Sequence, residues 1–169
     1  EDGSEETGFG NPTRTSIFDY VGVPAHQRWM NNKQFDGGQL TNEEKILRDF
    51  YKRLLNFTIN SSALANEYQD IHLYNRKHTD GYNDKVLSFV RWSETEKLII
   101  VSNFDAENSY SFNLKIPKSI IDVWNLDKNK YEVKDQLYKQ FSTDLIIEED
   151  FGSINITLNA LESFILKIQ

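Results

Sequence analysis

The side chains that could carry chemistry in this 169-residue chain include 26 carboxylates and three histidines, but no cysteine. Without cysteine, disulfides, thiol catalysis and thiolate metal ligands are excluded. His26, His72 and His78 are not spaced as a zinc-binding motif, so structural or exposed histidines are expected. The sequence also lacks a phosphate-binding glycine loop, a nucleophile elbow and a His-Glu-x-x-His motif. These motifs therefore assign no catalytic residue, no metal ligand and no cofactor.

Two tryptophans, Trp92 and Trp124, are candidates for sugar binding, because an aromatic face can stack on the apolar face of a glucose ring. Trp92 is expected to end a strand and Trp124 to precede a turn, which predicts partial exposure for both. The alternative is that they belong to the core, as aromatic residues of β-sandwiches commonly do.

Composition limits the classes of partner. The formal net charge is −7 and the pI is about 5.0, so the surface repels phosphate backbones and nucleic acid is not expected as a partner. No apolar run approaches the roughly 18–20 residues of a membrane span, and no basic run suits anionic lipid, so no membrane partner is expected either. A 13% aromatic content predicts a packed core.

The pattern of elements divides the chain in two. Residues 1–40 are rich in turn-forming residues and predict loops. Thr41 and Glu44 fit a capping box, and apolar residues at helical spacing predict a helix over about 42–55. Beyond residue 67 the apolar period is two, which predicts an antiparallel β-sandwich. The expected strands are 68–74, 85–92, 97–104, 110–116, 131–138, 144–147, 153–158 and 163–168.

Several of these segments resemble bacterial α-amylase-family enzymes. Residues 10–20 (GNPTRTSIFDY) and 23–29 (VPAHQRW) resemble the segment after the last strand of that family's catalytic barrel. The helix at 40–55 resembles the closing helix of the barrel, and 62–64 (SAL) resembles the connector after it. The strands at 86–91 and 98–104 and the closing run 161–166 (LESFIL) resemble the C-terminal β-domain, so the resemblance covers nearly the whole chain.

The resemblance implies a mainly β fold: an antiparallel Greek-key β-sandwich of the amylase C-terminal type, preceded by a loop-rich segment and one α-helix from the end of a TIM barrel. The implied domains are 1–60, a loop and closing helix of an otherwise absent (β/α)8 catalytic barrel, and 61–169, an all-β sandwich domain. The missing barrel is therefore the expected partner.

For function, the resemblance implies a retaining glycosidase that hydrolyses α-1,4-glucosidic bonds of starch and maltooligosaccharides. That reaction requires two carboxyl groups about 5–5.5 Å apart. The family's catalytic carboxylates lie upstream of Glu1, so this chain alone is predicted to be inactive and to act as a stabilising accessory domain. The implied location of the parent protein is periplasmic or extracellular.

Two residues of the N-terminal acidic stretch, Asp2 and Glu5, become candidates through the same resemblance. Loops after barrel strands border the active site, so these carboxylates could line the sugar cleft, although a solvated acidic loop gives the same pattern. The alternative function for the whole chain is a non-catalytic starch-binding β-sandwich module. A β-domain that binds protein is the third reading, and it leaves residues 10–29 unexplained.

Overall fold

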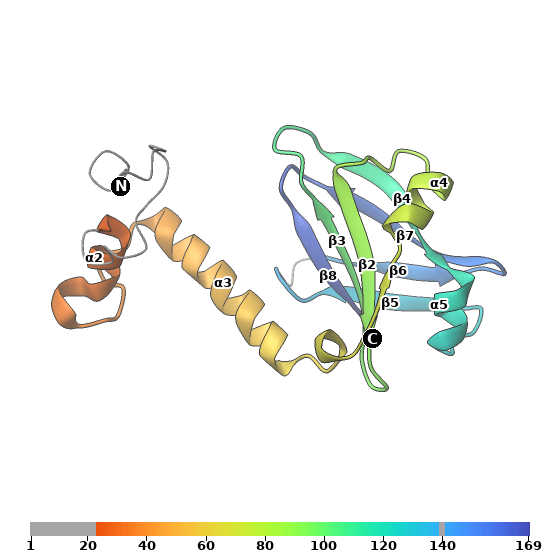
Figure 1. Ribbon diagram of the computed structural model, residues 1–169, viewed down its shortest axis with the longest axis horizontal. Helices are drawn as coiled ribbons and strands as arrows, with labels where there is room; N and C mark the ends of the chain where they lie inside the picture. Colours follow the sequence, from red (N-terminus) through yellow and green to blue (C-terminus); the bar gives the residue numbers. More distant parts are fainter. Residues whose placement is uncertain (1–22, 139–140) are drawn as a thin grey trace, which may run out of the picture. The chain divides into compact units, whose positions relative to one another are not determined.

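The computed structural model describes residues 23–138 and 141–169. The chain divides into two compact units, Glu1–Arg53 and Leu54–Gln169, and helix α3 (Asn42–Asn60) runs through the boundary between them (Figure 1). We refer to the second unit as the β-domain. None of the described helices combines the length and the apolar character needed to cross a bilayer.

In the first unit, the described part before α3 contains a helix where only loops were predicted. Helix α2 spans Pro24–Met30, with its proline at the first helical position, where a missing N–H costs nothing. The short 3-10 helix η1 (Asn31–Lys33) follows. The prediction of a loop was wrong here because the seven residues of α2 are too few to show a clear apolar period. Residues 10–20, which carry part of the family resemblance, lie outside the described residues.

Helix α3 begins with the predicted capping box. The Thr41 N–H donates to Glu44 Oε2 at 2.9 Å, and the Glu44 N–H donates to Thr41 Oγ1 at 3.3 Å. Arg28 of α2 donates to the same carboxylate, with Nε 2.9 Å from Oε2. The hydrogen bond from Arg28, followed by the one from the Thr41 backbone, lowers the pKa of Glu44 to about 2. The helix ends at Asn60, five residues beyond the predicted end.

The apolar face of α3 has two edges. Leu54 and Phe57 pack on a small cluster of the β-domain, formed by Ala63, Leu98, Ile100 and Ile165. The other edge is a stripe at i, i+4 spacing that stays exposed, and α3 contains no fully buried residue. We call this edge the α3 stripe; its exposed fractions are 57% for Leu47, 52% for Tyr51, 57% for Leu55 and 81% for Ile59.

The β-domain is an eight-stranded antiparallel sheet in the order β1-β2-β3-β8-β5-β6-β7-β4 (Figure 1). Strands β5, β6 and β7 form a meander, and β4 pairs with β7, which is a Greek-key arrangement. The predicted mainly β, antiparallel Greek-key fold is therefore confirmed. The strands are β1 (Glu67–Asp70), β2 (Val86–Trp92), β3 (Lys97–Asn103), β4 (Tyr110–Pro117), β5 (Lys130–Asp135), β6 (Ser142–Ile147), β7 (Phe151–Leu158) and β8 (Ser163–Ile168).

One core holds both halves of this sheet together. Val90 and Val101 of one half lie in the same buried cluster as Leu114, Leu145 and Ile154 of the other half. Apolar residues alternate with exposed ones along most strands, as expected for a sheet with one buried face. The sheet curls around this core as the two faces of a sandwich do.

Three departures from the predicted elements have local causes. The strand predicted over 68–74 is wrong beyond Asp70, because the Asp70 carboxylate accepts the His72 N–H at 3.0 Å and helix α4 (His72–His78) begins there. Helix α5 (Lys118–Val123), which was not predicted, directly follows Pro117. The strand predicted to reach 138 ends at Asp135, whose carboxylate accepts the N–H groups of Leu137 and Tyr138.

Candidate functional site

The structure brings together two of the four candidate site residues. Asp2 and Glu5 lie outside the described residues. The rings of Trp92 and Trp124 contact each other edge to face, with centroids 6.3 Å apart and an interplanar angle of 71°. Trp29 belongs to the first unit, where it contacts Phe35.

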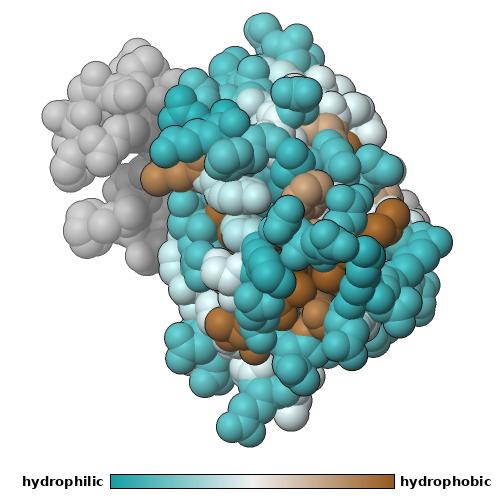
Figure 2. Space-filling model, turned by 90° about the vertical axis from the view of Figure 1, so that its right-hand side faces the viewer, coloured by the Kyte–Doolittle hydropathy of each residue, from teal (hydrophilic) through white to brown (hydrophobic). Residues whose placement is uncertain are grey.

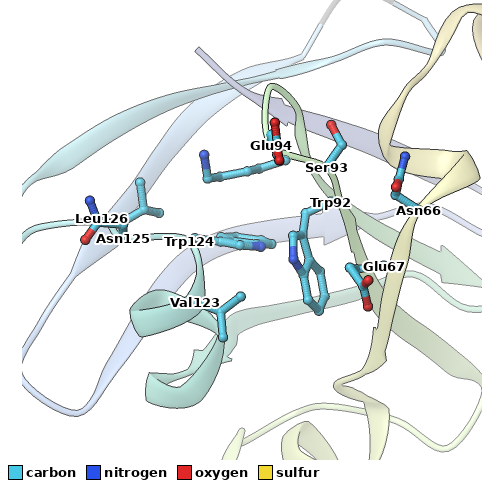
Figure 3. Close-up of a pocket in the computed structure, with 10 residues that line it drawn as sticks. Asn66, Glu67, Trp92, Ser93, Glu94, Val123, Trp124, Asn125 and Leu126 are labelled. Carbon is cyan, nitrogen blue, oxygen red and sulfur yellow. The ribbon is translucent and has the colours of Figure 1, made fainter.

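A surface hollow of about 700 Å³ surrounds this tryptophan pair (Figure 3). Trp92, Ser93, Glu94 and Lys97 contribute the end of β2, the turn after it and the start of β3. Asn66 directly precedes β1 and Glu67 is its first residue, and α5 and the residues after it add the rest. We call it the tryptophan hollow; its lining residues are Asn66, Glu67, Trp92, Ser93, Glu94, Lys97, Val123, Trp124, Asn125 and Leu126.

The strand register explains why these segments meet. Trp92 is the last residue of β2, where it pairs with Glu67 of β1 on one side and with Lys97 of β3 on the other. Trp124 follows α5, and its backbone N–H donates to the Ile120 carbonyl at 2.9 Å. Asn125 then adopts a left-handed conformation with φ of 52°, which turns the chain at the edge of the hollow.

The two tryptophans differ in burial. Trp92 is partly exposed, as predicted. Trp124 is only 3% exposed, so the prediction of partial exposure is wrong for this residue. The reason is that Trp124 packs into the main core beneath Trp92. Its indole Nε1 is the only buried side-chain polar atom without a hydrogen-bond partner in residues 23–138 and 141–169.

The carboxylates around the hollow have different roles. Glu96 is buried and accepts from the Ser61 hydroxyl at 2.6 Å, the Ala63 N–H at 3.0 Å and Lys167 Nζ at 2.9 Å. Burial raises the pKa of Glu96, but these hydrogen bonds outweigh burial and lower the pKa overall. Glu96 therefore attaches the segment after α3 to the β-domain.

By contrast, the side chains of Glu67 and Glu94 are exposed. No hydrogen bond or ion pair within the described ranges engages either carboxylate, so both are available to a ligand. The Ser93 hydroxyl is occupied, because it bonds to Ser62 at 2.8 Å and accepts the Glu96 N–H at 3.1 Å.

A second buried carboxylate, Asp105, was not singled out from the sequence. It accepts from Tyr110 Oη at 2.7 Å, Lys85 Nζ at 2.9 Å and the Glu107 N–H at 2.9 Å. The hydrogen bond from Tyr110, followed by that from Lys85, holds its pKa well below the usual range. Five donor groups, including the backbone N–H and the side-chain amide of Asn108, surround this carboxylate, so it fixes the loop after β3 and is not free to exchange protons near neutral pH.

The histidines do not converge. His72 Nδ1 lies 3.1 Å from Tyr82 Oη, which lies 2.9 Å from Ser88 Oγ. Burial raises the pKa of Tyr82 to about 12, so its phenol stays protonated at neutral pH. His78 stacks against Tyr74 instead. Among the described residues, no three His, Cys, Asp or Glu side chains are grouped so that they could hold a metal ion.

Around α4 and α5 the surface is mixed. Figure 2 shows a face that is mostly hydrophilic, with apolar side chains gathered in its lower half between hydrophilic ones. Val123 at the end of α5 is 61% exposed. The tryptophan hollow is suited to a ligand, because it combines apolar and unpaired polar groups in one depression.

Known proteins share this fold. Residues 77–169 match the family model described as alpha amylase, C-terminal all-beta domain. A structure of AmyP in complex with maltotriose is 16% identical, with a TM-score of 0.50 over 78% of this chain and 23% of that chain. An Anoxybacillus α-amylase is 13% identical, with a TM-score of 0.48 over 80% of this chain and 25% of that chain. The trehalulose synthase MutB from Pseudomonas mesoacidophila is 20% identical, with a TM-score of 0.41 over 72% and 17% of the two chains.

These structural similarities extend over a quarter or less of each larger protein, and at such identities they concern the fold alone. A search of curated proteins found no match. The family model covers the β-domain from the end of α4 to the last residue, which is more than half of the chain. The chain therefore belongs to the family of α-amylase C-terminal all-beta domains.

Proposed function

We propose that this chain is the C-terminal region of an α-amylase-family glycosidase that hydrolyses α-1,4-glucosidic bonds by a retaining mechanism. In this proposal, the chain is a stabilising accessory region and the catalytic carboxylates lie in a barrel outside it. Residues 1–60 would complete that barrel, and residues 61–169 would form the accessory domain.

The observation that carries the proposal is the α3 stripe. Leu47, Tyr51, Leu55 and Ile59 are all more than half exposed, although they follow one another at i, i+4 spacing on a regular helix. A helix with such a face is stable in water when another apolar surface covers it. The closing helix of a catalytic barrel has this requirement, because it packs on the barrel strands and on its neighbouring helices.

The size of the structurally similar proteins is also consistent with a catalytic barrel that covers the α3 stripe. The matched AmyP chain is more than four times as long as the region it shares with this chain, since the match covers 23% of it. A (β/α)8 barrel needs about 250 residues. A polypeptide of AmyP length has room for such a barrel in addition to the β-domain.

The experiment uses the full-length gene product that contains this sequence. Leu47→Asp places a charge in the α3 stripe, and we expect the thermal midpoint of the whole protein to fall by several degrees, with loss of starch hydrolysis on mild heating. Lys45→Asp, on the polar side of the same helix, is the matched control and should keep both properties.

An unchanged midpoint and unchanged hydrolysis in Leu47→Asp would contradict the role of α3. Absence of α-1,4-glucan hydrolysis in the unmodified full-length protein would contradict the proposed activity.

A further inference from the structure

We propose that the tryptophan hollow binds a neutral α-glucan chain, with Trp92 as the platform for a sugar ring. The choice of an α-glucan over other neutral oligosaccharides rests on the proposed function. The existence of the site rests on the hollow itself, and four observations support it.

The first observation is the orientation of the platform. Trp92 is partly exposed in the hollow, and Figure 3 shows the nitrogen-bearing end of Trp124 directed toward it. The rings meet edge to face at 6.3 Å, an arrangement favoured by aromatic quadrupoles. Because Trp124 is held in the core, Trp92 keeps a fixed orientation and loses little conformational entropy when a ligand binds.

The second observation is the unpaired indole N–H of Trp124. Buried polar atoms in folded proteins nearly always have a partner, so an exception needs an explanation. Here the N–H lies next to the Trp92 ring, whose electron-rich π system offers a weak acceptor. The unpaired N–H of Trp124 thus faces the residue that lines the hollow.

The third observation is the apolar neighbourhood. Val123 is exposed on the α5 side of the hollow, and Leu126 lines the same side and is half-buried. Pyranose rings have an apolar face and a polar rim, and Val123 and Leu126 give the hollow an apolar side that suits such a face.

The fourth observation is the set of hydrogen-bonding groups around this apolar floor. Glu67 and Glu94 are exposed and, within the described residues, accept no hydrogen bond. Carboxylates accept hydrogen bonds from hydroxyl groups. The Asn125 amide, also exposed, can both donate and accept. Two carboxylates beside one lysine, Lys97, in a chain of net charge −7 disfavour phosphate and other anions, so a neutral polyhydroxylated ligand fits the rim.

The volume of the hollow also suits a small-molecule site. The volume of about 700 Å³ falls within the range of about 300–1,000 Å³ that is usual for small-molecule sites.

The test uses the 169-residue chain, titrated with maltoheptaose and, separately, with cellohexaose. The readout is the set of indole N–H resonances in a nitrogen–proton correlation spectrum, which reports the three tryptophans individually. We expect saturable shifts of the Trp92 and Trp124 resonances with maltoheptaose at millimolar concentrations, and no shift of Trp29. Tryptophan-to-phenylalanine variants assign the three signals.

The variant Trp92→Ala should weaken binding by about tenfold or more, which corresponds to about 1.4 kcal/mol. Trp29→Ala is the matched control and should bind as the unmodified chain does. Because Trp92→Ala also removes a contact with the core, the exposed pair Glu67→Ala and Glu94→Ala provides a second test. Each of these two variants should weaken binding severalfold and leave the thermal midpoint unchanged.

Absence of a Trp92 shift with both sugars would overturn the proposal, as would binding that Trp92→Ala and the two glutamate variants leave unchanged. Binding of cellohexaose without maltoheptaose would overturn the α-glucan class. The outcome is independent of the activity measured on the full-length protein: an active enzyme with an empty hollow contradicts only this inference, and a sugar-binding hollow in an inactive protein contradicts only the proposed function.

Discussion

The β-domain core and the α3 stripe are made from the same kinds of apolar residue, yet they differ in what covers them. Leu114 and Ile154 are completely buried between the two halves of the curled sheet. Leu47 and Ile59 lie on a regular helix and remain mostly exposed. The β-domain thus covers its own apolar surface, whereas no residue within 23–138 or 141–169 buries the stripe.

The comparison shows that one region of a chain can bury its own apolar residues while another region of the same chain cannot. The core strands pair with partners within the domain, and their side chains meet across one shared interior. The stripe can form as a helix, but its burial depends on another body. Variants in four places test this contrast.

The largest effect is expected from Leu114→Ala in β4. The substitution removes a fully buried side chain from a core that has no solvent access. We expect the free energy of unfolding of the chain to fall by about 2–5 kcal/mol. Denaturant unfolding, followed by the near-ultraviolet signal of the β-domain aromatics, measures this change. A loss below about 1 kcal/mol would show that the core is looser than described.

The next effect concerns the junction between the two regions. Glu96→Ala leaves the Ser61 hydroxyl, the Ala63 N–H and Lys167 without their acceptor. Leaving such buried donors unsatisfied should lower the free energy of unfolding by about 1–3 kcal/mol. Glu94→Ala, two residues away and exposed, should change the same free energy by no more than about 0.5 kcal/mol. Equal effects of the two variants in urea denaturation would argue against the junction.

A pH dependence follows from Asp105 and Glu96, two of the buried carboxylates of the β-domain. The pKa values of Asp105 and Glu96 are both lowered in the folded protein, so the unfolded chain binds protons more readily. Their contribution to stability is present above the unfolded pKa of about 4 and is lost progressively as the pH falls below about 5, through the folded pKa values.

In Asp105→Asn, stability should be lower at neutral pH and should fall less between pH 5 and pH 3. Thermal melts across that range measure the slope. A slope identical to that of the unmodified chain would mean that Asp105 is not the group that titrates.

The smallest effect is expected in the α3 stripe. Leu47→Ala in the isolated chain removes a side chain that is 57% exposed, so the free energy of unfolding should change by no more than about 0.5 kcal/mol. The same variant should reduce self-association, because exposed apolar patches drive association. Sedimentation at several concentrations measures this, and a large loss of stability would show that the stripe is already covered within the chain.

Much of the fold could be predicted from periodicity. The alternation of apolar residues located β2, β3, β4, β7 and β8 within about two residues, and the Thr41–Glu44 pair marked the start of α3. These signals are local, because each element shows its own buried face in its own sequence.

The short helices could not be predicted in this way. Helix α4 depends on Asn75, a polar residue that is fully buried. Its amide donates to the Lys115 carbonyl of β4 at 2.9 Å, so the helix is held by a contact that is distant in the sequence. The helix propensities of the seven residues of α4 carry no information about such a tertiary contact.

The candidate site could be predicted from the sequence only in part. Trp92 and Trp124 stood out individually as aromatic residues near strand and turn ends, but their contact depends on where α5 folds. Glu67 and Glu94 were not selected, since only the register of β1 against β2 brings Glu67 beside Trp92. Strand pairing is a non-local property, and the sequence of either strand alone does not contain it.

The position of β8 in the sheet has a consequence for biosynthesis. In the strand order of the described residues, β8 is the link between β1-β2-β3 and β5-β6-β7-β4, because it pairs with β3 on one side and β5 on the other. β8 is also the last of these strands to leave the ribosome. Until residues 163–168 emerge, a nascent chain holds two half-sheets with open edges, and such edges attract other strands. Chaperone capture of the two half-sheets before β8 emerges should therefore raise the fraction of the protein that reaches its native state.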